Sequence, residues 1–166
     1  MAKHKARKQQ PVVQPAPVVR QTMAKPIAQY IVADDLRTLM ANAKRLGRDD
    51  VWREAFRRFC ALEAADQTDP LHRGFFEMLA AYEHLLAERN ARATRASPIR
   101  LRARNKGVVQ CLEECTTGKT PTEGYELLTE KGFPEFTGEH LVLKYADRFS
   151  PAAVAAARAR IEPGQG

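Results

Sequence analysis

The stretch PLHRGFFEMLAAYEHLLAERN, residues 70–90, decides the fold of this chain. Its apolar residues recur at spacings of three and four, which places them on one face of an α-helix. This face comprises Leu71, Phe75, Met78, Leu79, Tyr82, Leu85 and Leu86. Asp69 and Pro70 predict the start of the helix, since aspartate caps free N–H groups and proline suits the first helical position. Other helices are needed to cover this apolar face.

Two further helices are predicted before this stretch, where apolar residues again follow a helical period. The first carries Leu36, Leu39, Met40, Ala43 and Leu46, and the second carries Trp52, Ala55, Phe56, Phe59 and Cys60. Gly47 suits the end of the first helix, and Asp49 or Asp50 the cap of the second. Residues 43–56 resemble one unit of a tetratricopeptide repeat. No second copy recurs at the expected period, so we expect a plain helical hairpin.

Helix start signals recur after the stretch. In Ser97-Pro98, Thr120-Pro121 and Ser150-Pro151, a hydroxyl side chain at the cap precedes proline at the first helical position. Glu123 follows Thr120 by three residues, as in a capping box, and Thr137 caps one more short helix. Because no hairpin of strands is recognisable, the chain predicts an all-α fold of about seven helices.

The predicted helices fall into two halves. Residues 29–162 form the expected helical domain, with a long-helix hairpin half at 33–92 and a compact bundle of short helices at 97–161. A basic connection, residues 89–106, joins them. Residues 1–28 are rich in Lys, Gln, Pro and Val without a period, which predicts a disordered basic tail. Residues 163–166 are expected to be a flexible end.

Positive charge is concentrated at two places in a chain of net charge +7. Residues 1–25 carry six lysines and arginines and no acid, and residues 89–106 carry seven and no acid. The seven are Arg89, Arg92, Arg95, Arg100, Arg102, Arg104 and Lys106. Several phosphate contacts made together release condensed counterions, so such a cluster favours the backbone of DNA or RNA as a partner.

A single helix starting at Pro98 is expected to carry most of these cations. It would place Leu101, Val108, Leu112 and Cys115 on one apolar stripe, with Arg102 and Lys106 facing solvent and Arg100 and Arg104 near the stripe's edge. Thr94, Ser97 and the free N–H groups of the helix N-terminus would assist phosphate binding. A helix-turn-helix across 97–131 or 120–147 is compatible with the short connections.

Other sites are weakly supported by the sequence. A P-loop over residues 117–120 is rejected, because Glu113 replaces its first glycine and no strand precedes it. Cys111 and Cys115 lie on the apolar stripe, which favours core packing over zinc binding. The carboxylates show no converging pattern, so no catalytic residue, metal or cofactor is predicted. No apolar run approaches the roughly 20 residues of a membrane span. Three cysteines fit a reducing, cytoplasmic location.

Three functions follow, in order of preference. The first is non-enzymatic binding of DNA or RNA through the seven cations, aided by the basic tail. The second is protein–protein interaction through a helical hairpin that presents Trp52, Phe56 and Phe76. The third is a small helical nuclease or a nuclease accessory. Salt-dependent nucleic-acid binding separates the first from the second, and metal-dependent cleavage would favour the third.

Overall fold

The structure, a computed structural model, describes residues 25–162. This part of the chain is all-α, as predicted, and contains no strand. Its elements are η1 Ile27–Gln29, α1 Ala33–Arg45, α2 Asp49–Glu63, α3 Pro70–Asn90, α4 Ser97–Lys106, α5 Val108–Thr117, α6 Glu123–Glu130, η2 Pro134–Phe136, α7 Gly138–Lys144, η3 Ala146–Arg148 and α8 Pro151–Ile161. Among these helices, none is both long and apolar enough to cross a membrane.

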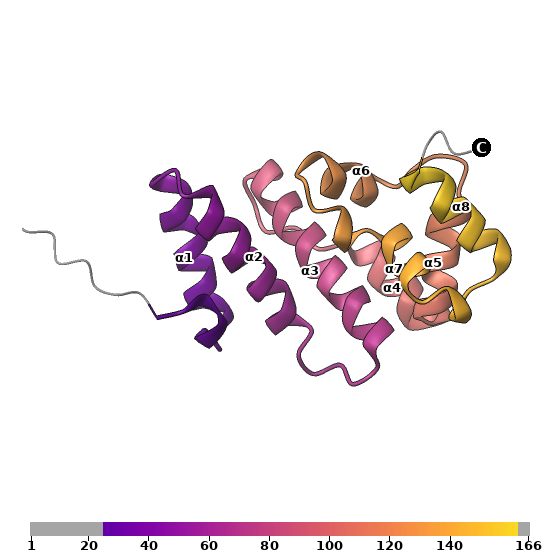
Figure 1. Cartoon of the computed structure of the whole chain (residues 1–166), viewed down its shortest axis with the longest axis horizontal. Helices are drawn as coiled ribbons and strands as arrows, with labels where there is room; N and C mark the ends of the chain where they lie inside the picture. The colour runs from indigo at the N-terminus through magenta and orange to yellow at the C-terminus, as the bar shows by residue number, and fades with distance from the viewer. Residues whose placement is uncertain (1–24, 163–166) are drawn as a thin grey trace, which may run out of the picture.

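Helix α3 is the central element of the fold. Figure 1 shows α1, α2 and α3 following one another from the left of the molecule, with α5 to α8 on the other side of α3. Eight residues of α3 are buried, among them Phe75 and Leu79, and the predicted apolar face is confirmed except that Met78 is only partly buried. The helix starts as predicted, because Asp69 accepts a hydrogen bond from the backbone N–H of His72 at 2.9 Å.

Helices α1 and α2 form the predicted hairpin, and α2 packs against α3. Gly47, with φ +66°, ends the first helix as expected. Leu46 was expected on the buried face, but it is 64% exposed because it lies at the C-cap, outside the regular helical turns. Asp49 and Asp50 stand in the first turn of α2 rather than at its cap, where they favour the positive end of the helix dipole.

Helices α5, α7 and α8 pack together and complete the short-helix half. Two predicted caps are confirmed here, since Thr137 accepts from His140 and Ser150 accepts from Ala153. The prediction at Thr120 is wrong by two residues. Thr122 caps α6 instead, by accepting from the N–H of Tyr125 at 3.2 Å.

The helix predicted to run on from Pro98 is broken at Gly107. This residue has φ +88° and ψ 160°, a combination that glycine tolerates because it lacks a Cβ atom. The break changes the helical phase, so α4 and α5 do not share one stripe. Val108 and Leu112 are buried as expected, but Leu101 is 48% exposed.

The predicted tail extends four residues into the described part of the chain. Residues 25–28 do not behave as predicted, because Ile27 begins η1 and packs partly against the core. Tyr30 follows, and its carbonyl accepts a hydrogen bond from Arg58 at 3.0 Å. The rest of the predicted tail, up to residue 24, and the expected flexible end at 163–166 lie outside the described residues.

Candidate nucleic-acid interface

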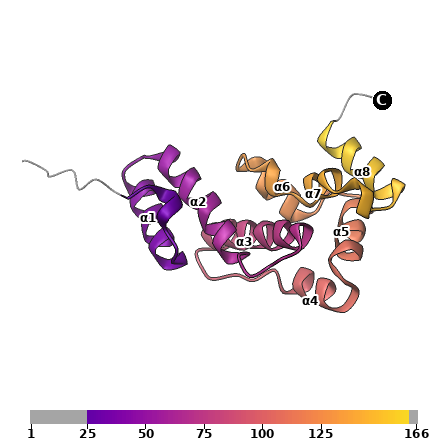
Figure 2. The same cartoon turned by 60° about the horizontal axis from the view of Figure 1, so that its bottom comes forward.

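Helix α4 carries four of the seven predicted cations. It is the only α-helix within residues 25–162 that has no buried residue. None of its ten residues is buried. Its main packing neighbour is α5, and Figure 2 shows it at the lower edge of the molecule, apart from α1 and α2. Ile99 and Ala103, four residues apart, are partly buried against the core. The opposite side of α4 is therefore turned to solvent.

Glu83 of α3 holds the N-terminal end of α4. Arg100 donates to its two carboxylate oxygens at 2.7 and 2.8 Å, and the N–H of Ala96 donates at 2.7 Å. Burial alone raises the pKa of Glu83, but these hydrogen bonds outweigh it, and the pKa lies below its ordinary value. Arg95 approaches the same carboxylate at 3.9 Å. Ser97, the predicted cap, makes no capping bond, because it is the first residue of α4 and Ala96 occupies the N-cap position.

Glu114 of α5 holds the other end of α4. Lys106 lies 2.7 Å from one carboxylate oxygen, and Arg102 lies 3.5 Å from the other. Arg102 also donates to the sulfur of Cys115 at 3.5 Å. Arg102 and Lys106 were expected to face open solvent. They lean towards α5 instead, because the break at Gly107 folds α5 back alongside them.

The remaining predicted cations differ in their surroundings. Arg89, at the end of α3, pairs with Glu123 of α6. Arg92 and Arg104 are exposed and form no ion pair with any residue of 25–162. Arg95, Ser97, Arg100, Leu101 and Arg104 line one shallow hollow on the surface of α4. The structure thus gathers four of the predicted residues, Ser97 included, on one side of this helix.

The Thr94 hydroxyl and the N-terminal end of α4, both expected to bind phosphate, are already hydrogen-bonded to other groups of the protein. The hydroxyl of Thr94 donates to the carbonyl of Arg92 at 3.0 Å. The N-terminal end of α4 already faces the carboxylate of Glu83. The turn of three or four residues that joins a helix-turn-helix is not found within 97–131 or 120–147. Gly107 alone joins α4 to α5, residues 118–122 join α5 to α6, and residues 131–137 separate α6 from α7.

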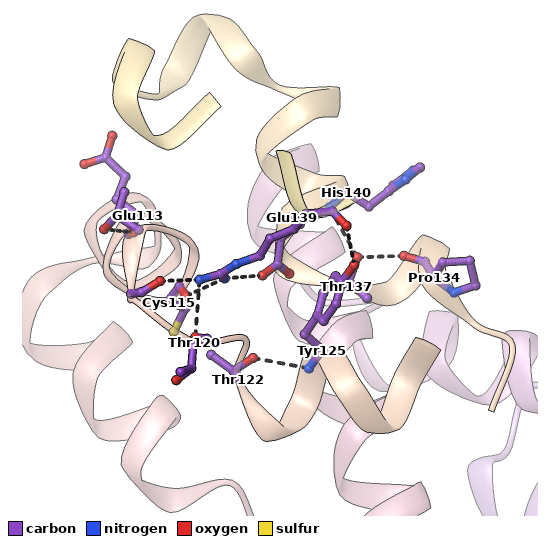
Figure 3. Close-up of polar contacts among 12 residues, drawn as sticks. Glu113, Cys115, Thr120, Thr122, Tyr125, Pro134, Thr137, Glu139 and His140 are labelled. Atoms are coloured by element: carbon purple, nitrogen blue, oxygen red, sulfur yellow. Dashed lines mark hydrogen bonds and ion pairs between the residues drawn. The ribbon is translucent and has the colours of Figure 1, made fainter. Parts of the chain in front are cut away.

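A second charged cluster, which sequence reasoning missed, is buried between α5, α7 and α8. Glu139 has only 3% of its side chain exposed and pairs with Arg160 at 2.7 Å. Arg160 also donates to the carbonyls of Cys115, Gly118 and Thr120. Figure 3 shows Cys115, Thr120 and Glu139 around this point. Each terminal guanidinium nitrogen of Arg160 makes two contacts, so the cluster holds α8 in place. The one sequence signal for this cluster is the acidic residue Glu139 in the first turn of α7.

The three aromatic residues expected to meet a protein partner differ in exposure. Phe56 is fully buried, whereas Trp52 and Phe76 are both partly buried. Phe76 packs edge-on against Phe75 with ring centroids 5.5 Å apart. Trp52 lines a groove of about 320 Å³ with Leu85 and Phe133.

Cys111 is fully buried, as expected for core packing, and Cys115 is half-buried. The hydrogen bond with Cys111 and the guanidinium of Arg102 lower the pKa of Cys115. The hydrogen bond between the two thiols, together with burial, raises the pKa of Cys111. Within residues 25–162, no three His, Cys, Asp or Glu side chains gather at a metal-binding distance.

Comparison with protein families, with curated proteins and with solved structures finds no match to this chain.

Proposed function

We propose that this protein is a non-enzymatic nucleic-acid-binding protein that contacts the phosphate backbone through residues 89–106. The observation that carries the proposal is a charge imbalance. Seven cations lie in this segment, and three carboxylates, those of Glu83, Glu114 and Glu123, contact them. Positive charge in excess of the local acids is what a polyanion attracts.

The exposed position of α4 supports the same proposal. A phosphate backbone must approach the cations without displacing core packing, and α4 buries no residue. Arg104 stands on the solvent side, and Arg92 lies in the connection that leads to the helix. Both are without an ion-pair partner in the described residues, so binding a phosphate breaks no existing pair. Arg100, Arg102 and Lys106 contribute to the field while they hold the helix.

The test is the salt dependence of binding, measured with the full chain and a labelled duplex. Affinity falls steeply as salt rises between about 50 and 200 mM. The variant Arg92→Ala/Arg104→Ala reduces the slope of log affinity against log salt by about 1 for each lost contact. Arg45→Ala/Arg158→Ala is the matched control, since both are exposed arginines in the last turn of a helix and neither forms an ion pair in residues 25–162.

The proposal fails if binding is independent of salt, or if the two double variants have the same slope. Cleavage of the bound duplex in the presence of Mg²⁺ would instead support the nuclease alternative. A protein partner is the second candidate, because Trp52, Leu85 and Phe133 line one groove together with four cations and the carboxylates of Asp49 and Glu88. A peptide whose binding is lost in Trp52→Ala and unchanged in Arg104→Ala would favour it.

A further inference from the structure

Four exposed residues form one row along the outer side of α4. Ser97, Leu101, Arg104 and Asn105 have the spacing i, i+4, i+7 and i+8, which places them on one face of a helix. All four are exposed, and their side chains make no hydrogen bond or ion pair within residues 25–162. We call these four residues the outer row.

The other sides of α4 are fixed by contacts to the rest of the protein. Ile99 and Ala103 lie against the core, opposite the outer row. Arg100 binds Glu83 of α3 on one flank, and Arg102 reaches Glu114 of α5 on the other. These contacts on both flanks set the rotation of α4 about its axis, so the outer row is held towards solvent in one orientation.

Three side chains of the outer row are of the kinds that contact base edges in the major groove. Asparagine pairs with adenine, serine bonds to several bases, and an aliphatic group contacts the thymine methyl, whereas an arginine beside them can bind a phosphate. The side chain of Leu101 is 48% exposed, and this contact with water costs free energy. The methyl group of a thymine in the major groove would cover it. A lipid surface is a poorer match, because binding there needs a broad apolar face and α4 exposes one large apolar residue.

The size of α4 favours B-form DNA over RNA. Ten residues give a helix about 15 Å long and roughly 10–12 Å wide, which fits a B-form major groove about 12 Å wide. The major groove of A-form RNA is too narrow and deep for side chains to read. Figure 2 shows α4 at the lower edge of the molecule.

We infer that α4 enters the major groove of double-stranded DNA with the outer row towards the groove. Ser97, Leu101 and Asn105 face the bases, while Arg104 and, in the preceding connection, Arg92 and Arg95 contact phosphates. This inference rests on the proposed nucleic-acid binding and adds the type of nucleic acid and the reading surface. Glu83 and Glu114 act as positioning residues, since they hold the helix and do not touch the DNA.

The experiment compares the full chain with two charge-neutral double variants. Leu101→Ala/Asn105→Ala removes two side chains of the outer row. Leu46→Ala/Asn42→Ala is the matched control, since it removes an exposed leucine and an exposed asparagine from the end of α1. Both pairs are solvent-exposed, so the fold is retained, and thermal unfolding verifies this for each variant. Binding is measured to a random-sequence DNA pool, to the duplexes enriched from it, and to RNA duplexes of the same sequences.

We expect the wild-type chain to enrich a short base pattern and to bind the enriched DNA at least tenfold more tightly than the matching RNA duplex. Leu101→Ala/Asn105→Ala lowers affinity for the enriched DNA about fivefold or more and leaves the salt slope unchanged. The control variant changes neither quantity.

Equal binding to the DNA and RNA duplexes, absence of any enriched pattern, or equal affinities of the two double variants would overturn the inference. In each of these cases the proposed backbone binding still stands if Arg92→Ala/Arg104→Ala lowers the salt slope. A chain without salt-dependent binding would instead remove both proposals.

Discussion

Helices α3 and α4 lie next to each other in the chain and are held in place in opposite ways. Eight of the 21 residues of α3 are buried, and α2, α6 and α7 pack around it. None of the ten residues of α4 is buried, and carboxylates of α3 and α5 hold it at its two flanks. One helix is fixed by apolar area and the other by charge.

An arginine-rich segment and a binding surface are therefore not the same set of residues. Three of the four cations on α4, namely Arg100, Arg102 and Lys106, are used to orient it. The residues left free are fewer, and some of them are uncharged. A helix held in this way can be aligned with a partner without being covered by the core.

The largest expected effect is a loss of stability on truncating a buried side chain of α3. Phe75→Ala in α3 empties a fully buried site and should lower the free energy of unfolding by about 3–5 kcal/mol. Leu101→Ala in α4 should change it by less than about 0.5 kcal/mol, because the side chain is already half in water. Urea unfolding measures both. Comparable losses would show that α4 is packed as tightly as α3.

The next effect concerns the carboxylate that joins the two helices. Glu83→Ala removes the acceptor of Arg100 and of the Ala96 N–H, and about 1–2 kcal/mol of local stability should be lost after allowance for the partial exposure of Arg100. Amide hydrogen exchange should accelerate in α4 and stay unchanged in the core of α3. Glu54→Ala, at an exposed glutamate without an ion pair in residues 25–162, is the control. Uniform acceleration in both helices would contradict a local role.

The same contact should depend on pH. The folded pKa of Glu83 lies below its ordinary value, so the carboxylate stabilises the fold at all pH values above the unfolded pKa. This contribution is lost as pH falls through the folded pKa. The protection of α4 amides, corrected for intrinsic exchange, should therefore decrease on acidification below about pH 4. In Glu83→Ala this acid dependence should be lost at the N-terminal end of α4, while Glu114 still holds the other end. Persistence of the full dependence at the N-terminal end would assign it to other groups.

The last prediction concerns the reactivity of Cys115, where the effect on stability is smallest. It tests how closely Arg102 of α4 lies to α5. Its lowered pKa predicts alkylation by iodoacetamide at a lower pH than an ordinary thiol, since the thiolate is the nucleophile. Cys60 and Cys111 are buried and should react only on unfolding. Arg102→Ala should move the pH midpoint of Cys115 upwards, whereas Arg104→Ala should not. Peptide mass analysis resolves the three sites, and equal midpoints in both variants would exclude a contribution from Arg102.

The sequence by itself determined the helices that are built on apolar period and local capping. The face of α3 could be predicted because burial selects residues three and four apart, and Asp69, Thr137 and Ser150 act on N–H groups three residues away. The clustering of seven cations in residues 89–106 is likewise a property of the sequence alone. Local rules suffice wherever the interacting groups are close in the chain.

Only the tertiary structure decided which of those cations are free and which side of α4 faces outwards. Arg100 meets Glu83 from 17 residues away, and Arg160 meets Glu139 from 21 residues away, so neither pair follows a helical spacing. The positive φ of Gly107 breaks the predicted helix, so α5 does not continue the phase of α4. Leu101 is exposed, although the predicted stripe grouped it with the buried Val108 and Leu112. Ion pairs between helices depend on how the helices pack, and packing is fixed by the whole core rather than by neighbours in sequence.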